Sequence, residues 1–493
     1  MNDRQPIDRT VSTPESSEPS KRDNSDKSTS ETNTDTPSTP HWVDELKRVL
    51  RADQVSQSPS VLDQHSHDES YHTPRRPDAV VFPESTEDVV HIMQVSAQFR
   101  VPVVPFGVGS ALEGHVVPVK GGITVDTSRM NRILEVRPDD FLVKVEPGVT
   151  RIELNEALRP YGLFFPVDPG ANASLGGMAA TNASGTTTVR YGAMKDNVRS
   201  LTVVLADGSV IQTASLAAKS SSGYNLTGLF VGSEGTLGVF TEIWLKVVGL
   251  PEHIVGARAV FETVSDAVRA STAMVGTGLL VSRVELVSAL YIDVFNRLEG
   301  TDFPVHPTLF LEFGGTRGAV ESSVEMAREI AADEGCQRWT AVEDASERTR
   351  LWKVRHEAAH TFMKQFPGYG HMATDVCVPL SKLPGAIANA ERLLESEGVR
   401  GSMIGHVGDG NFHVSLAVRP GDKGDLERAN AVNKGLVEYA LSVGGTCTGE
   451  HGVGLGKRKY QALEHGNALN VMRTIKSALD PDGRLNPGKL IDA

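Results

Sequence analysis

The spacing of apolar positions divides the chain into helices and strands from about residue 82 onward. Apolar residues recur every three or four positions from Ser85 to about Arg100, which predicts a helix, and Asp88 would complete a capping box with the Ser85 hydroxyl. A buried strand from Val101 to Pro105 is predicted next. Further strands are predicted at 122–126, 141–146, 201–205 and 210–213, and a helix capped by Thr150 at 150–159.

Two β-α-β patterns follow Pro251, each made of a strand, a helix and a second strand. The strands are predicted at 255–261, 279–286, 309–313 and 339–342. The apolar faces of the intervening helices are explained by packing and carry no chemistry. This half of the chain is therefore predicted to form a split α/β domain of the ferredoxin-like kind.

Glycine-rich stretches interrupt these patterns. Residues 107–110 directly follow a buried strand, where glycines let backbone amides approach a phosphate closely. Residues 168–197 have neither helical nor strand periodicity and consist mainly of small residues, which predicts a long functional loop around a flat, polar cofactor; disorder is the alternative. Residues 229–239 predict a second strand pair punctuated by glycines.

The stretch MIGHVGDGNFH, residues 403–413, alternates apolar and polar positions on both sides of Asp409-Gly410. This dipeptide favours a type I′ turn, so a β-hairpin is predicted in which His406 faces His413. Opposed Cβ atoms in such a hairpin lie about 5 Å apart, which allows both imidazoles to bind one metal ion.

Glu450 and His451 lie between glycines further along the chain and offer a carboxylate and a third imidazole. Two histidines, a carboxylate and an open position are typical of a catalytic metal site. Histidines that merely satisfy hydrogen bonds are the alternative for each residue alone. The occurrence of the four groups in two glycine-rich turns favours the metal site.

Composition limits the classes of protein that the chain can represent. Its 493 residues, 39% of them hydrophobic, exceed the size of a single core and predict two lobes. A net charge of -13 without a basic block argues against nucleic acid and anionic lipid as partners. Three widely spaced cysteines fit a reducing compartment, and no apolar run reaches the roughly 18 residues of a membrane span.

The first forty residues, rich in Ser, Thr, Pro, Asp and Glu, are predicted to be a disordered tail. They lack the apolar core of a signal peptide, and their acidic residues are unlike a mitochondrial presequence. A cytoplasmic location is therefore expected, with peripheral contact at the inner face of the membrane left open.

Six sequence blocks resemble a known family. PFGVGSALEGH, DPGANASLGGMAATNASG and FVGSEGTLGVFTE are similar to the PCMH-type FAD-binding domain of the vanillyl-alcohol oxidase superfamily. GHVGDGNFH, GEHGVG and DPDGRLNPGK resemble its D-lactate dehydrogenase (cytochrome) branch, close to glycolate oxidase subunits and D-2-hydroxyglutarate dehydrogenases. The resemblance runs from about Pro74 to Lys489.

The resemblance implies an α+β fold with a two-lobed PCMH-type FAD-binding domain and a split α/β cap that holds the substrate. The expected divisions are a tail at 1–40, a helical segment at 41–73, the FAD-binding domain at 74–251, the cap with the metal site at 252–470, and a segment at 471–493 that returns to the FAD-binding domain.

The resemblance also assigns roles to individual residues. His406, His413 and Glu450 match ligands of a divalent metal (zinc, manganese or iron), His451 matches the proton acceptor, and Arg355 matches the arginine that holds the substrate carboxylate. The bound FAD is expected to be non-covalent, although His115 raises the question of a covalent link. The expected FAD-binding residues are Pro105, Gly107, Gly109, Ser110, Pro169, Gly176, Gly177, Ala180, Asn182, Gly185, Glu234, Gly235, Gly238, Val239 and Asn486.

The implied activity is FAD-dependent oxidation of a small D-2-hydroxy acid, with electrons passing to cytochrome c, a quinone or another flavoprotein. Relatives that accept a dicarboxylate carry a lysine where this chain has Ala373, so D-lactate, oxidised to pyruvate, is the expected substrate. A glycolate oxidase-like subunit and a D-2-hydroxyglutarate dehydrogenase are alternatives within the family. A zinc hydrolase and a non-catalytic interaction scaffold are the alternatives from other classes.

Overall fold

The structure, a computed structural model, describes residues 41–491 without the side chains at 356 and 358–360. The predicted disordered tail lies outside the described residues. From His41 onward the chain forms one unit. It contains helices and several sheets that are separate from one another, which confirms the predicted α+β class. Within the described range, no helix is long and apolar enough to cross a membrane.

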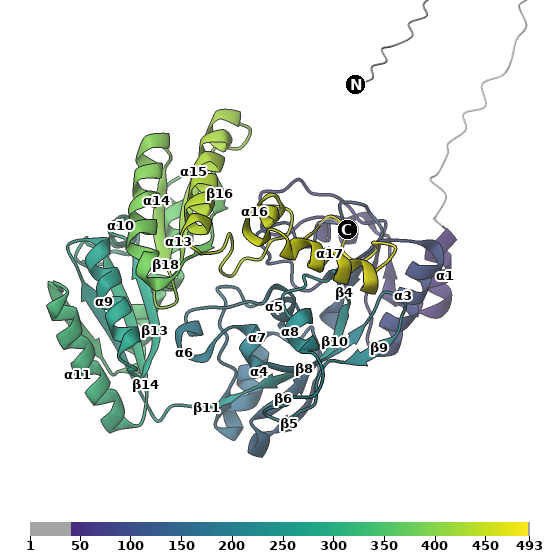
Figure 1. Cartoon of the computed structure of the whole chain (residues 1–493), viewed down its shortest axis with the longest axis horizontal. Helices are drawn as coiled ribbons and strands as arrows, with labels where there is room; N and C mark the ends of the chain where they lie inside the picture. Colours follow the sequence, from purple (N-terminus) through teal and green to yellow (C-terminus); the bar gives the residue numbers. More distant parts are fainter. Residues whose placement is uncertain (1–40, 492–493) are drawn as a thin grey trace, which may run out of the picture. The chain divides into compact units, whose positions relative to one another are not determined.

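The first lobe contains two main sheets (Figure 1). One sheet has the order β1 (Val55–Ser56), β2 (Ala79–Val81), β4 (Ile123–Asp126), β3 (Val103–Phe106), and the other β5 (Ile133–Arg137), β6 (Leu142–Val145), β10 (Val239–Lys246), β8 (Val198–Val204), β9 (Val210–Gln212). A small pair joins β7 (Leu163–Phe164) to β11 (Val248–Gly249). The helices are α1 (His41–Val49), α2 (Pro59–Gln64), α3 (Thr86–Phe99), α4 (Arg151–Leu158), α5 (Leu175–Thr181), α6 (Thr188–Tyr191), α7 (Met194–Asn197) and α8 (Leu226–Phe230).

The second lobe is built on one antiparallel sheet. Its order is β15 (Arg338–Val342), β12 (His253–Val260), β14 (Thr308–Gly315), β13 (Val281–Val287), β18 (Gly401–Gly405), β19 (Asn411–Val418), β16 (Gly370–Ala373), and β17 (Val376–Cys377) also pairs with β19. The first four strands, with the helices that connect them, have the order of a ferredoxin-like unit. Both predicted β-α-β patterns are therefore present.

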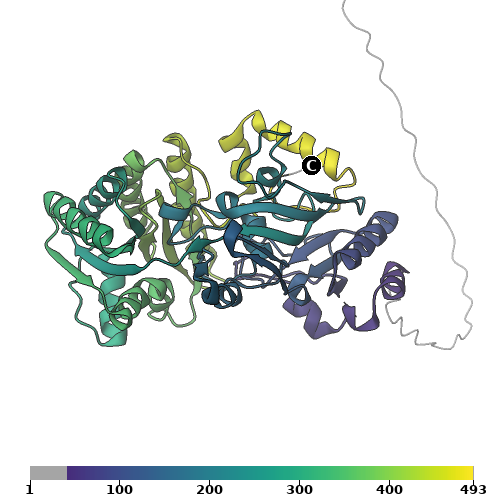
Figure 2. The ribbon, with the colours of Figure 1, turned by 90° about the horizontal axis from the view of Figure 1, so that it is seen from below.

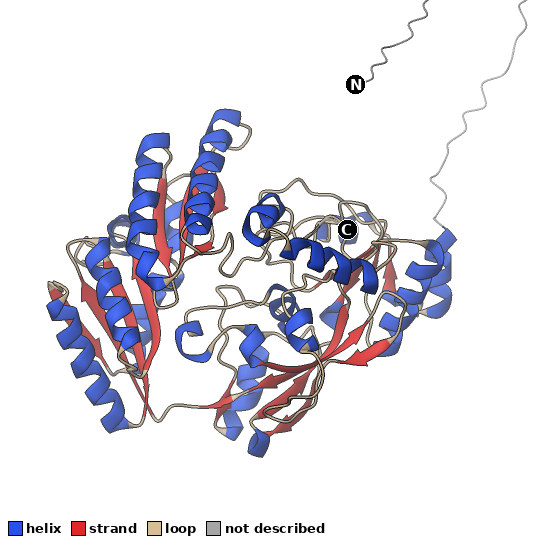
Figure 3. Ribbon diagram, in the orientation of Figure 1, coloured by secondary structure: helices blue, strands red, loops and turns tan. Residues whose placement is uncertain are grey.

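Helices cover both faces of this sheet (Figure 3). One layer comprises α9 (Val264–Gly276), α11 (Arg317–Asp333), α14 (Leu383–Glu397) and α15 (Lys423–Ser442), and the other α10 (Ala289–Glu299), α12 (Ala345–His356) and α13 (Ala358–Met363). Leu309 and Leu311 pack into the first layer and Phe310 into the second, as the alternation of side chains along a strand requires. This explains the continuous apolar run in β14.

Local capping decided where the first predicted helices begin. Ser85 Oγ accepts the backbone N–H of Asp88 at 3.1 Å, as predicted. The carboxylate of Asp88 does not complete a capping box; it accepts the N–H of Glu84 at 2.8 Å and the side-chain amide of Gln54 at 2.8 Å. Thr150 caps α4 through the N–H of Glu153.

Two predicted segments differ from the structure. Residues 168–197 are not free of regular structure, because they contain the short helices α5, α6 and α7. Residues 229–239 do not form a strand pair. The backbone has positive φ at Gly232, Glu234 and Gly235, which turns the chain sharply between the end of α8 and the start of β10.

The C-terminal segment packs on the first lobe. Helix α17 (Ala468–Leu479), which follows α16 (Gln461–His465), lies beside the strands of that lobe in Figures 1 and 2. The N–H of Val103 in β3 donates to the carbonyl of Arg484 at 2.8 Å, and the N–H of Asn486 donates to the carbonyl of Val103 at 2.7 Å. Lys476 Nζ donates to the carbonyl of Thr236 at 2.7 Å.

Lys489 near the chain end is expected to make stability rise with pH. Burial lowers the pKa of its ammonium group from 10.5 to about 8. Between pH 8 and 10 the unfolded chain therefore binds more protons than the folded one, so the free energy of unfolding increases with pH. Replacing Lys489 by methionine should reduce this slope by up to about 1.4 kcal/mol per pH unit. Denaturant unfolding of both proteins at several pH values measures it, and equal slopes would contradict the expectation.

Candidate functional site

The predicted hairpin is present as β18 and β19, but its register was predicted wrongly. His413 pairs with Ile404, not with His406. Asp409 is not in a positive-φ conformation, so the turn is not type I′; its N–H instead donates to the carbonyl of His406 at 3.1 Å. His406 lies just beyond the end of β18, and the two imidazole centroids are nevertheless 5.5 Å apart.

His406, His413 and Glu450 present their ligand atoms to a common point. The Nε2 atoms of His413 and His406 lie 3.1 Å and 3.5 Å from the two carboxylate oxygens of Glu450. The Nδ1 atoms are engaged on the other side, by Glu285 at 2.7 Å for His406 and by the carbonyl of Thr374 at 3.1 Å for His413. Such outer contacts orient metal-ligating imidazoles, so this donor set fits a divalent metal.

The charges of this cluster favour a cation. Burial opposes ionisation of His406, but the carboxylates of Glu285 and Glu450 raise its pKa well above its usual value. Burial likewise opposes ionisation of Glu450, but His406 and His413 lower its pKa well below the usual range. A divalent metal ion would take the place of the proton that His406 otherwise holds. From the first lobe, Ser184 Oγ donates to Glu450 at 3.3 Å.

His451 lies against the cluster. Its ring stacks on that of His413 with centroids 4.9 Å apart and an interplanar angle of 4°. Burial lowers the pKa of His451 to about 4, so the imidazole is neutral near pH 7 and can accept a proton. Its Nδ1 is buried without a hydrogen-bond partner. Buried polar atoms are usually hydrogen-bonded, so this nitrogen is a candidate for contact with a bound ligand.

Arg355 reaches the same region through Glu285. Its Nε and one terminal nitrogen both lie 2.6 Å from Oε2 of Glu285, whose other oxygen holds His406. The Glu285 side chain is fully buried. Glu285 therefore joins the arginine expected to hold a carboxylate to a predicted metal ligand.

Sequence reasoning assigned no role to Glu285, Asp375, Ser184 or Lys457. Asp375 is fully buried and accepts the backbone N–H groups of Glu450 and His451. Lys457 is also buried and lies 3.4 Å from Asp375. A carboxylate in the apolar strand VSRVELV was the available signal for Glu285, because buried charges require partners. Nothing comparable marked Ser184.

The expected FAD-binding residues divide by burial. The partly exposed ones can line a ligand groove: Pro105, Gly107, Gly109, Ser110, Pro169, Gly177, Ala180 and Asn182. The buried ones shape the loops beneath: Gly176, Gly185, Glu234, Gly235, Gly238, Val239 and Asn486. The hydroxyls of Ser174 and Ser233 in these loops are buried without partners, which fits a polar cofactor such as FAD.

The side chains of Glu234 and Asn486 are hydrogen-bonded to other protein groups. The Glu234 carboxylate accepts the N–H groups of Val453 and Gly454 at 2.7 and 2.9 Å. The Asn486 side chain donates to the carbonyls of Glu234 and His115 at 2.7 and 3.1 Å. The imidazole of His115 is itself buried, with Nε2 3.3 Å from Glu234.

The neighbouring glycines Gly176 and Gly177 allow the effect of a glycine on packing to be distinguished from its effect on FAD binding. A Cβ on Gly176 would lie 2.5 Å from Pro147 Cβ, whereas one on Gly177 would meet only Ser174 Oγ at 3.2 Å. Gly176→Ala is expected to destabilise the FAD-free protein by about 1–3 kcal/mol. Gly177→Ala should leave that stability intact and weaken FAD binding about tenfold, through steric hindrance worth about 1.4 kcal/mol. Unfolding of the FAD-free protein and fluorescence titration with FAD test both; unchanged FAD affinity in Gly177→Ala would remove Gly177 from the predicted set.

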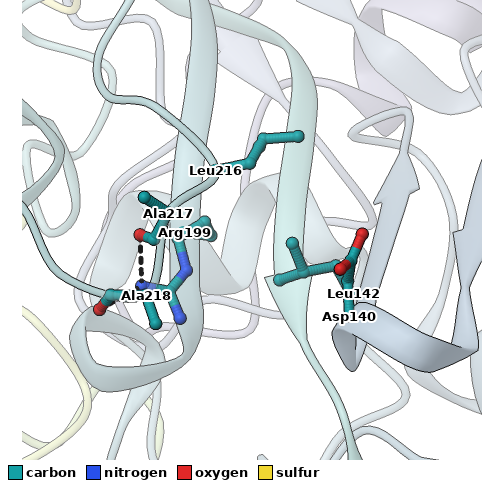
Figure 4. A pocket seen from close by; sticks show the side chains of 6 residues that line it. All are labelled: Asp140, Leu142, Arg199, Leu216, Ala217 and Ala218. Atoms are coloured by element: carbon teal, nitrogen blue, oxygen red, sulfur yellow. Dashed lines mark hydrogen bonds between the residues drawn. The ribbon is translucent and has the colours of Figure 1, made fainter.

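A surface hollow elsewhere on the first lobe does not belong to this site. Figure 4 shows the side chains that line it. The hollow encloses about 360 Å³, and the Arg199 guanidinium donates to the carbonyls of Ala217 and Ala218. Its lining residues are Asp140, Leu142, Arg199, Leu216, Ala217 and Ala218. It includes no predicted site residue, so the polar cluster around Glu450 is the stronger functional candidate.

The sequence and fold match known flavoproteins. Residues 77–214 match the family described as FAD binding domain, and residues 250–490 match FAD linked oxidases, C-terminal domain. The fold resembles a 4-ethylphenol oxidase from Gulosibacter chungangensis with a TM-score of 0.74 at 20% identity, covering 91% of this chain and 96% of that one. The two lobes and the site between them thus define a flavin-dependent oxidoreductase.

The relatives refine this class. The chain is 44% identical over 454 residues to the "Probable D-lactate dehydrogenase, mitochondrial" of Danio rerio, covering 91% of each protein. It is 45% identical over 416 residues to the "D-lactate dehydrogenase [cytochrome], mitochondrial" of Arabidopsis thaliana, covering 84% of this chain and 73% of the relative. The chain belongs to the FAD linked oxidase family, in its D-lactate dehydrogenase branch.

These relatives correct one expectation. Both are mitochondrial by name, which contradicts the predicted cytoplasmic location. That prediction relied on the acidic composition of the first forty residues, and composition of a short segment was a weaker guide than similarity over most of the chain.

Proposed function

We propose that this protein is a FAD-dependent dehydrogenase that oxidises D-lactate to pyruvate and passes the electrons to cytochrome c. The D-lactate dehydrogenase relatives support the substrate and the acceptor. The observation that carries the proposal is the imidazole of His451, whose buried Nδ1 has no partner and whose ring stacks on His413, a member of the ligand set His406, His413 and Glu450.

Oxidation of a 2-hydroxy acid removes a hydride from carbon and a proton from the hydroxyl group. FAD, held by the partly exposed glycine-rich residues of the first lobe, supplies the hydride acceptor when bound. His406, His413 and Glu450 would hold a divalent metal, which would supply Lewis-acid chemistry to the substrate. The metal and its ligand roles are part of the proposal.

The remaining work falls to the chain's own side chains. His451 takes the hydroxyl proton, for which a neutral imidazole is suited. Arg355 binds the carboxylate through the terminal nitrogen that does not contact Glu285, and Glu285 fixes the orientation of the guanidinium. Because Ala373 offers no charge, a second carboxylate on the substrate would lack a partner, which favours a monocarboxylate.

The decisive test uses the purified, metal-replete protein under anaerobic conditions. It is mixed separately with D-lactate, L-lactate, glycolate and D-2-hydroxyglutarate while the flavin absorbance is followed. D-lactate is expected to bleach the flavin at least about tenfold faster than the others, a difference of about 1.4 kcal/mol in the barrier.

Other outcomes identify the alternatives. Faster bleaching by glycolate favours a glycolate oxidase-like subunit, and faster bleaching by D-2-hydroxyglutarate contradicts the argument from Ala373. A colourless protein with hydrolytic activity would replace the flavin proposal by a zinc hydrolase.

A further inference from the structure

Residues 449–454, here called the strap, connect the two lobes through their backbone amides. The strap carries Glu450 and His451 at one end and Val453 and Gly454 at the other, with Gly452 between them at φ +81°. Because the side chains of Glu450 and His451 belong to the proposed site, the position of the strap backbone determines where they lie.

A buried carboxylate holds each end of the strap. From the second lobe, Oδ2 of Asp375 accepts the N–H groups of Glu450 at 3.0 Å and His451 at 2.9 Å. From the first lobe, Glu234 accepts the N–H groups of Val453 at 2.7 Å and Gly454 at 2.9 Å. The four N–H groups are thus shared between two acceptors on different lobes.

The Asp375 carboxylate is firmly fixed itself. Its Oδ2 also accepts the hydroxyl of Thr448 at 2.7 Å, and its Oδ1 accepts the side-chain amide of Asn411 at 2.7 Å. Lys457 Nζ lies 3.4 Å from Oδ2 and 3.3 Å from Glu113. A buried carboxylate with this many donors remains ionised and rigid, since moving it would leave several buried donors unpaired.

We propose that Asp375 and Glu234 are positioning residues that hold the strap from the two lobes. Asp375 acts through the amides of Glu450 and His451 and sets the place of the carboxylate and imidazole used in the proposed reaction. Glu234, expected from its sequence block to bind FAD, acts instead on the far end of the strap. The activity and metal readouts below rest on the proposed function, whereas the amide-exchange readout does not.

The test compares Asp375→Asn with Asp480→Asn. Asp480 is a matched control because it is equally buried, accepts the N–H groups of Arg484 at 3.0 Å and Leu485 at 2.8 Å, and pairs with Lys476, outside the strap. Both variants should lower the unfolding midpoint. Asp375→Asn alone should speed hydrogen exchange in peptides covering 448–454, weaken metal retention and lower kcat roughly 10–100-fold, with KM within about threefold.

The opposite result overturns the inference. If Asp375→Asn and Asp480→Asn have the same hydrogen exchange at 448–454, the same metal retention and the same kcat, Asp375 has a structural role only. Should Asp375→Asn not fold, Thr448→Val removes one donor to the same oxygen and is expected to shift exchange and metal retention in the same direction; an unchanged Thr448→Val would then refute the proposal.

Glu234→Gln tests the other end. Faster exchange at 453–454 with FAD affinity within about threefold of wild type supports a positioning role, and unchanged exchange with lost FAD contradicts it. If wild-type protein neither retains metal nor oxidises D-lactate, the proposed function fails, while the exchange comparison still decides the role of the two carboxylates.

Discussion

Replacing His413 by alanine is expected to lower kcat/KM for D-lactate roughly 1,000-fold and to abolish stoichiometric metal binding. His413 Nε2 lies 3.1 Å from Glu450, and its Nδ1 is held by the carbonyl of Thr374. A Lewis acid supplies several kcal/mol of transition-state stabilisation, and about 1.4 kcal/mol corresponds to a tenfold rate change. FAD should remain bound, because its expected residues lie in the first lobe.

The measurements are metal analysis after dialysis and initial rates with D-lactate. His371 provides the control, since it lies on the neighbouring strand β16 and its Nε2 contacts Ser415 Oγ at 3.0 Å. His371→Ala should retain metal and keep kcat/KM within about threefold of wild type. A His413→Ala protein that turns over normally without metal would remove the metal from the proposed function.

Removing the charge of Glu285 is expected to be the second most damaging change, although Glu285 is not a predicted ligand. The side chain is fully buried and holds Arg355 at 2.6 Å and His406 at 2.7 Å. In Glu285→Gln an amide must face one of these donors with its own N–H groups, so one contact is lost. Breaking a buried ion pair costs about 3–5 kcal/mol, and loss of outer contacts to a metal ligand lowers activity roughly 10–100-fold.

Two readouts distinguish the consequences of the Glu285→Gln change. The KM for D-lactate should rise because Arg355 is no longer oriented, and metal retention should fall because His406 is no longer fixed. Glu312→Gln is the control: Glu312 lies on the adjacent strand β14 and contacts Arg283 at 3.5 Å. It should change neither quantity beyond about threefold. Equal effects of the two variants would show that Glu285 acts only through stability.

Periodicity predicted α3, α4 and the two β-α-β patterns, because local spacing sets these elements, but it did not predict the short helices α5, α6 and α7. The β-α-β patterns and the start of α3 at Ser85 follow from residues close in sequence. The hairpin register did not. Asp409-Gly410 predicts a two-residue turn, but in the structure the N–H of Val378 donates to the carbonyl of Gly410 at 3.1 Å, and this tertiary contact accompanies a different turn.

The candidate site was predictable only for residues within recognisable blocks. His406, His413, Glu450 and His451 come together in the structure, and their roles remain predictions. The side chain of Glu234 contacts amides about 220 positions away in sequence, which no local pattern reveals. Mutual contacts among buried charges, as at Glu285, likewise depend on the completed fold.

The return of the C-terminal segment to β3 has a consequence for biosynthesis. The backbone partners of Val103 are residues 484 and 486, which leave the ribosome only after the whole second lobe has been made. Domains commonly fold in the order of their synthesis. The first lobe of this chain therefore cannot complete its hydrogen bonding until residues 484 and 486 have been synthesised, after all of the second lobe.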